Sequence, residues 1–218
     1  MWWTLGISAV VGLLAIAAWY GGCVRWNRRR AGKLLRNIES TFMGYGSVNG
    51  HQWVSASEFH VDLRLSNCAF RHPNIIVKML PREMPLNWLI SRVRKQHETL
   101  TFEANLLCPP GFNLEVHNQR WWARTRRRMP KKDSIVRLKH IGPFILTSRR
   151  DWEREITSMV HALSASRDCD LLSVSFRRSE PHFSATILLN SMEEQNCSPV
   201  RMFDALRELA SGASAARF

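Results

Sequence analysis

The residues whose types and spacing could do chemistry are cations that lie close to tryptophans. The densest such group spans residues 119–132. Its cations could bind phosphate groups, while its indole rings could stack on bases or settle among lipid headgroups. Its predicted contact residues are Arg120, Trp121, Trp122, Arg124, Arg126, Arg127, Arg128, Lys131 and Lys132.

Three interpretations of residues 119–132 are open. As a solvated basic loop whose tryptophans fold back on the core, the segment needs no partner, and this is the simplest case. Of the two binding interpretations, contact with an anionic membrane surface is favoured over contact with nucleic acid, because no recognised RNA- or DNA-binding motif accompanies the charge. A protein partner for this basic surface is a further expectation.

A second group of cations follows an apolar run near the N-terminus. Residues 2–20 contain no charged side chain. At about 1.5 Å per residue, a helix of this length can cross the hydrocarbon core of a bilayer. Aromatic residues that suit the two headgroup layers flank the run: Trp2, Trp3, Trp19, Tyr20 and Trp26. The cations that follow, and that we expect to contact anionic headgroups, are Arg25, Arg28, Arg29, Arg30 and Lys33.

The same cations predict how the span is oriented. Lys and Arg close to a membrane segment stay on the cytoplasmic side, so we expect the N-terminus outside and residues 25–218 in the cytoplasm. A cleaved signal would need cations before the apolar run, and none is present, so the run is predicted to be an uncleaved signal-anchor. Eukaryotic targeting features are absent from the sequence, which favours a bacterial inner membrane.

Small residues within the span could support weak self-association. Ser8, Gly12 and Ala15 form a short strip along which a second helix could approach closely. Such residues are common in spanning helices, and Ile16 interrupts the four-residue repeat. A lipid-facing helix is therefore the simpler expectation, with a weak homo-oligomer as the alternative.

Composition agrees with a basic domain on the cytoplasmic side. The chain has 218 residues and a net charge of +13, which attracts it to anionic surfaces. Its five cysteines are an odd set without the short paired spacings of a disulfide framework or a zinc site, so we expect them to be reduced. They are Cys23, Cys68, Cys108, Cys169 and Cys197.

The sequence contains no catalytic set that its spacing supports. The eight histidines are scattered and include no HExxH pair, and Ser173 and Ser175 lie in a predicted strand, not in a nucleophile elbow. We therefore expect no catalytic residue, metal or cofactor, and a binding or scaffolding role in preference to catalysis. Two alternatives are a membrane-tethered nucleic-acid-binding protein and an enzyme whose site is assembled only in the fold.

The hydrophobic pattern predicts one α+β domain after the span. The expected division is a transmembrane anchor at 1–24, a basic juxtamembrane helix at 25–43, a soluble domain at 44–212 and a frayed tail at 213–218. Strands in runs favour a mainly antiparallel sheet, which two C-terminal helices would cover. The predicted strands are 59–65, 75–80, 99–107, 112–117, 135–140, 143–147, 172–176 and 183–189.

Helices and turns are expected between and after these strands. Residues 31–42 are predicted to continue the anchor helix, and capping patterns predict helices that begin at Ser148 and Ser198. Residues 44–50 are predicted to be a glycine-rich loop, and residues 72–74 a turn.

A short amphipathic helix is predicted at residues 86–93. It carries apolar residues at helical spacing beside Arg92, Arg94 and Lys95. It could lie on the membrane surface. Packing on its own domain is the more ordinary expectation.

Overall fold

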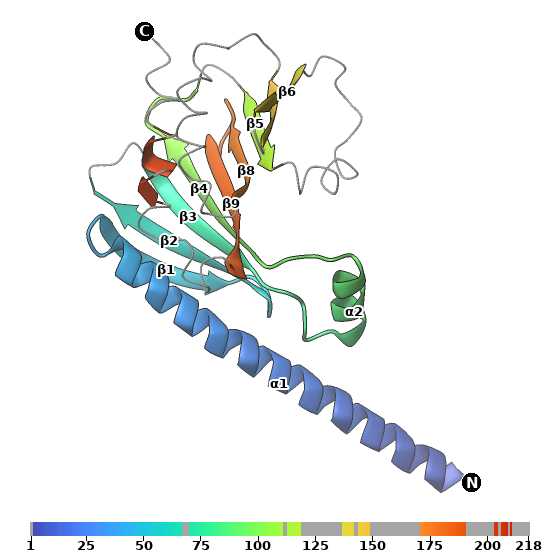
Figure 1. The fold of residues 1–218 in the computed structure, drawn as a ribbon. Coiled ribbons are helices and arrows are strands. Elements are labelled where there is room, and N and C mark those ends of the chain that lie inside the picture. The colour runs from blue at the N-terminus through green and yellow to red at the C-terminus, as the bar shows by residue number, and fades with distance from the viewer. Residues whose placement is uncertain are drawn as a thin grey trace.

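The architecture is a long helix joined to a single antiparallel sheet, as the computed structural model shows (Figure 1). The helices and strands are α1 Trp2–Phe42, β1 Gly46–Trp53, β2 Glu58–Leu65, β3 Phe70–Lys78, α2 Pro85–Val93, β4 Thr99–Leu106, β5 Leu114–Asn118, β6 Arg137–Ile141, β7 Phe144–Ser148, β8 Leu171–Phe176 and β9 Phe183–Leu188. The structure describes residues 2–66, 70–110, 113–118, 137–141, 144–148, 171–190, 203, 204, 206–208 and 210.

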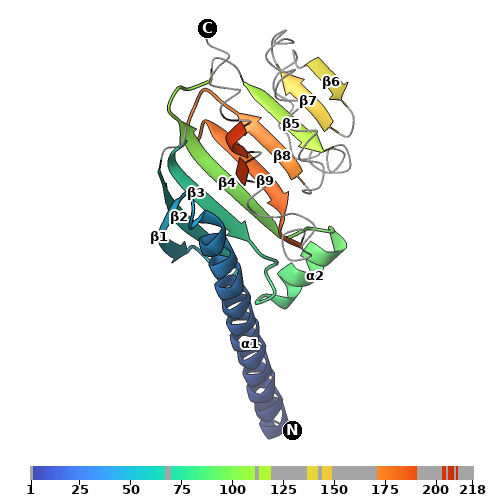
Figure 2. The same ribbon diagram turned by 60° about the vertical axis from the view of Figure 1, so that its left-hand side comes forward.

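The sheet has nine strands in the order β1-β2-β3-β4-β9-β8-β5-β7-β6, and all of its strand pairs are antiparallel. The β8–β9 hairpin lies between β4 and β5 (Figure 2). Strands β4 and β5 follow each other in the sequence but are therefore not adjacent in the sheet. Inward-facing residues alternate along the central strands, as in β4, where every second residue is buried. This alternation places one apolar face of the sheet toward α1.

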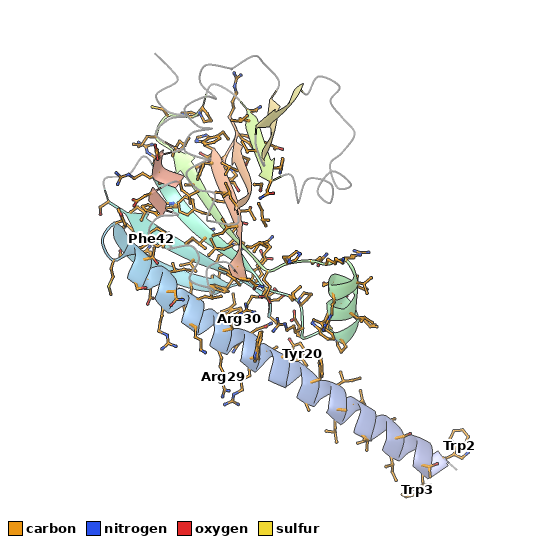
Figure 3. The ribbon with its side chains drawn as sticks, in the orientation of Figure 1. Trp2, Trp3, Tyr20, Arg29, Arg30 and Phe42 are labelled. Atoms are coloured by element: carbon orange, nitrogen blue, oxygen red, sulfur yellow. The ribbon has the colours of Figure 1, made fainter. Side chains whose placement is uncertain are left out.

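Helix α1 is continuous over 41 residues and has two different environments. From Trp2 to Gly22, every residue whose burial is described is exposed. In the second half, Ala31, Leu34, Ile38 and Phe42 are at most 4% exposed and belong to the sheet core. Figure 3 shows the first half extending beyond the sheet, with Trp2 and Trp3 at its far end and Phe42 against the sheet. By length and composition, α1 can cross a membrane.

A cluster of phenylalanines joins α1 to the centre of the sheet. Phe203 is fully buried, and its ring lies 4.8 Å from that of Phe42 and 6.3 Å from that of Phe102 (centroid distances). Residues 203, 204, 206–208 and 210 are helical and lie over β4 and β9 (Figure 2). Because aromatic side chains bury large areas, these contacts hold the second half of α1 to the sheet.

The α+β class and the antiparallel sheet are confirmed, as is the continuation of the anchor helix through residues 31–42. Of the two expected C-terminal helices, the one beginning at Ser148 lies outside the described residues beyond Ser148 itself, which ends β7. The one beginning at Ser198 is described only from residue 203, where Phe203 and Leu206 are buried. The expected tail at 213–218 also lies outside the described residues.

Two local predictions are wrong. The expected loop at 44–50 contributes most of its residues to β1, which pairs with β2 along its length. A Cβ on Gly46 would come within 2.1 Å of the Arg64 carbonyl oxygen, so glycine permits this pairing. The expected turn at 72–74 lies inside β3, where the register with β4 shifts and His72 takes a positive φ of 48°. It is therefore an irregularity within one strand.

One ion pair links β5 to the end of β8. An Arg177 Nη2 group donates to Glu115 Oε1 at 2.9 Å, and His117 Nε2 lies 3.6 Å from Glu115 Oε2. The neighbouring His117 ring, together with the bond and charge of Arg177, outweighs partial burial and lowers the pKa of Glu115 from 4.5 to about 2. Because the native pKa is the lower one, the pair stabilises the fold above pH 4.5, and this contribution disappears as the pH falls toward 2.

We predict that Glu115→Gln weakens the acid sensitivity of the fold. Between pH 5 and pH 2.5, the free energy of unfolding of the wild type should fall further than that of the variant, by about 1 kcal/mol after solvent screening. Urea titrations of the full chain in a mild detergent measure both slopes. Arg177→Gln, which removes the partner cation, should reduce the slope in the same direction. Equal slopes in all three proteins would contradict the assignment.

Candidate membrane-proximal site

A buried carboxylate closes the junction between α1 and the sheet. Glu98, just before β4, has a side chain only 5% exposed. Its Oε2 pairs with Arg30 Nη1 of α1 at 2.5 Å, and its Oε1 accepts from Arg82 Nη2 at 3.2 Å and from the Leu80 backbone N–H at 3.3 Å. Its own backbone carbonyl accepts from the Leu189 N–H at 3.0 Å. Glu98 therefore ties together α1, the segment after β3 and the end of β9.

Indole rings contact the arginine residues that pair with this carboxylate. The Arg82 guanidinium lies 4.0 Å from the centre of the Trp26 ring, within cation–π range, and Arg30 lies 5.4 Å from the same ring. Trp19 Nε1 donates to the Arg82 carbonyl at 3.0 Å, and the Trp19 and Trp88 rings are 6.5 Å apart. Two of the predicted interfacial aromatics are thus also contacts within the protein.

The segment between β3 and β4 carries α2 and forms an arm beside α1. In both ribbon views, α2 lies on the side of the sheet from which the N-terminal half of α1 emerges (Figures 1 and 2). Pro85 occupies the first turn, and Trp88 faces Trp19. Within α2, Ser91 is the buried residue. The expectation that its apolar residues pack on the domain is wrong, because Leu86 and Val93 are 74% and 76% exposed.

The predicted cations on α1 separate into two sets. Arg30 faces the sheet and is held by Glu98, whereas Arg29 points away from the sheet (Figure 3). Arg25, Arg28 and Lys33 are exposed as well, and the Arg28 guanidinium lies 6.0 Å from the centre of the Trp53 ring. Arg30 therefore already has a carboxylate partner inside the protein, and the other four face solvent.

Helix rise decides which of these cations lie near the end of the apolar run. Measured from Trp19, Arg25 is ~9 Å along the axis, Arg29 ~15 Å and Lys33 ~21 Å. Charges interact through solvent over about 8 Å at physiological ionic strength, and a long side chain extends that reach by a few ångströms. Arg25 therefore lies within this range of the end of the apolar run, Arg28 and Arg29 lie a few ångströms beyond it, and Lys33 lies ~10 Å beyond it.

The second predicted group, residues 119–132, lies outside the described residues. The strands nearest to it in the sequence are β5, which ends at Asn118, and β6, which begins at Arg137. Its binding role stays a prediction.

Two hollows occur near the sheet edge formed by β1 and β2. One, of about 270 Å³, lies between α1 and β1 and is lined by Arg28, His51 and Trp53 among others. The other, of about 350 Å³, includes Asp62 and His72. In the described part of the chain, no three His, Cys, Asp or Glu side chains are grouped so that they could hold a metal ion.

Sequence reasoning missed Glu98 and Arg82. Glu98 is an acidic residue in a strongly basic chain and directly precedes the strand predicted at 99–107. Such a position only weakly indicates a buried counter-ion. Arg82 follows the predicted strand at 75–80 and resembles any solvated cation in the sequence. Their role arises from the arm that brings residues 80–98 against α1.

The fold and the site define a class: a long N-terminal apolar helix built into an antiparallel sheet domain, with a clamped, cation-rich junction. No protein-family model matches the chain, and no curated protein matches it. Among solved structures, the chain matches the crystal structure of the mycobacterial trehalose monomycolate transport factor A with a TM-score of 0.34 and 10% sequence identity. The match covers 64% of this chain and 68% of that chain. A likeness at this level carries no argument about function.

We predict that Glu98→Ala destabilises the junction. The substitution leaves Arg30 and Arg82, only 15% and 27% exposed, without their shared counter-charge, and breaking such a buried pair costs about 3 kcal/mol. Chemical unfolding of the full chain in detergent measures the loss.

Glu58→Ala is the matched control for that loss. Glu58 also pairs with a cation, Lys78, but the two side chains are 28% and 56% exposed. Removing so exposed a pair should change the free energy of unfolding by less than about 1 kcal/mol. If the two variants lost equal stability, the clamp would have no special role.

Proposed function

We propose that the chain is a single-pass membrane protein whose basic sheet domain works by binding at the cytoplasmic surface of a bacterial inner membrane. The observation that carries this proposal is the double nature of α1. Its first half is apolar, uncharged and exposed, whereas its second half is part of the sheet core. Exposing an apolar helix of this length to water is unfavourable, and a bilayer removes that cost.

The cations that follow the apolar half support the orientation. Arg25, Arg28, Arg29 and Lys33 all lie on the domain side of the run. By the positive-inside rule, the N-terminus then lies outside and the sheet domain in the cytoplasm.

Electrostatics supports an anionic membrane as the surface that the domain binds. Each cation near an anionic leaflet contributes about 1 kcal/mol, so Arg25, Arg28 and Arg29 together favour anionic headgroups around the junction. The basic segment at 119–132 adds charge to the same domain. In this role the domain gathers anionic lipid or presents a surface to a protein partner.

We predict that α1 is embedded in the membrane with the domain in the cytoplasm. In a bacterial host, the chain should remain in the membrane pellet after alkaline carbonate extraction. A C-terminal alkaline phosphatase fusion should be inactive, and a C-terminal fluorescent protein should be bright. Active phosphatase would reverse the orientation, and release into the carbonate supernatant would remove the span.

We predict that the junction enriches anionic lipid. The full chain is placed in nanodiscs of equal phosphatidylglycerol and phosphatidylcholine, with one or the other brominated, and tryptophan quenching is compared. Quenching by the brominated anionic lipid should be stronger at low salt. In a triple variant with Arg25→Ala, Arg28→Ala and Arg29→Ala, the excess should fall by more than half.

A charge-matched variant separates position from net charge. Lys33→Ala, Arg36→Ala and Arg71→Ala remove the same three charges from exposed sites farther along α1 and on β3. The lipid preference should persist in this control. If both variants lost it equally, net charge alone would explain the effect. If the wild type bound nucleic acid with a steep salt dependence and showed no lipid preference, the nucleic-acid alternative would replace the proposal.

A further inference from the structure

The apolar residues of α2 form an exposed stripe. Leu86, Leu89, Ile90 and Val93 follow the spacing of one helix face and are 74%, 53%, 46% and 76% exposed. At 100° per residue, this stripe lies on the side of α2 opposite the buried Ser91. The helix therefore presents its apolar face to solvent while its other face is turned to the protein.

Two contacts fix the level of α2 along α1. The Trp88 ring lies beside the Trp19 ring, and the Trp19 indole donates to the Arg82 carbonyl just before α2. Trp19 is the next-to-last residue of the apolar run that begins at Trp2, ~26 Å away along the helix, close to the thickness of a hydrocarbon core. When α1 spans a bilayer, α2 is thus level with the headgroup layer on the domain side.

The residues around the stripe suit that layer. Arg92 precedes Val93, Arg94 and Lys95 follow it in the sequence, and all three cations are exposed. The Arg92 guanidinium lies over the Trp88 ring, 5.5 Å from its centre and within cation–π range. Apolar residues on one face with cations and an indole at its margin are the composition of a helix that lies in a membrane interface.

We propose that α2 is a second membrane contact, in which Leu86, Leu89, Ile90 and Val93 enter the boundary between headgroups and acyl chains. The inference rests on the proposed span, because α1 sets the level of α2. Its occupant is lipid, since Trp88 of the same helix lies beside Trp19 near the end of the apolar run and the charges that flank the stripe are positive.

The second contact gives the domain a defined orientation relative to the membrane. A single spanning helix leaves its domain free to rotate about the helix axis and to tilt. A contact at α2, displaced from that axis, opposes both motions. The Glu98 clamp transmits this restraint, because Arg82 belongs to the arm that carries α2 and Arg30 belongs to α1.

Photo-crosslinking of the full chain in native membranes tests the inference. A benzophenone amino acid replaces Leu86 or Val93, whose exposure allows the substitution without repacking. The same group at Val11, 59% exposed within the apolar run, reports the span. The matched control is Met43, an apolar residue 83% exposed just after α1, ~36 Å beyond Trp19.

Lipid adducts at positions 86 and 93 should exceed those at position 43 at least tenfold and approach those at position 11. Adducts at 11 but none above the control at 86 and 93 would overturn the α2 contact and leave the anchor intact. Protein adducts at 86 and 93 in place of lipid would also overturn it, in favour of a partner protein. A lack of lipid adducts at position 11 would contradict the proposed membrane span. It would also contradict the position of α2 at the headgroup layer, which is inferred from that span.

Discussion

Glu98 takes one arginine from α1 and another from the arm that carries α2, and most of the surface of all three side chains is buried. This shared carboxylate lies between the core of the sheet and the C-terminal end of the apolar run of α1. Without it, two cations would face each other at the entrance to the core. The carboxylate neutralises both cations beside the core in which Leu34 and Ile38 pack, and it links α1 to the arm that carries α2.

Much of the sheet could be predicted because burial repeats locally. Along β2, β4 and β9, apolar residues alternate with polar ones, and the structure buries the apolar set. The helical part of α1 beyond the apolar run was predictable for the same reason, since Leu34, Ile38 and Phe42 share one helix face. These patterns depend only on neighbours in the sequence.

The elements that escaped prediction depend on distant partners. Strand β1 has two glycines and a mostly exposed surface, so its strand character comes from pairing with β2. Arg30 resembles Arg29 in the sequence, and only the fold turns one toward Glu98 and the other away. The stripe on α2 was visible as an amphipathic pattern, but periodicity alone does not say whether such a face meets the protein or something outside it.

Because α1 is one continuous helix from the apolar run to the sheet core, a change in its tilt also moves the sheet domain. Asn27 precedes the core-facing part of α1, is fully buried, and donates to the Ala56 carbonyl at 3.1 Å. The domain therefore contacts the helix close to the apolar run. Spanning helices change tilt when bilayer thickness changes. With Phe42 ~33 Å beyond Tyr20, a tilt of about 10° moves that end by about 6 Å. In the proposed spanning arrangement, a change in bilayer thickness would therefore change the angle between the sheet domain and the membrane.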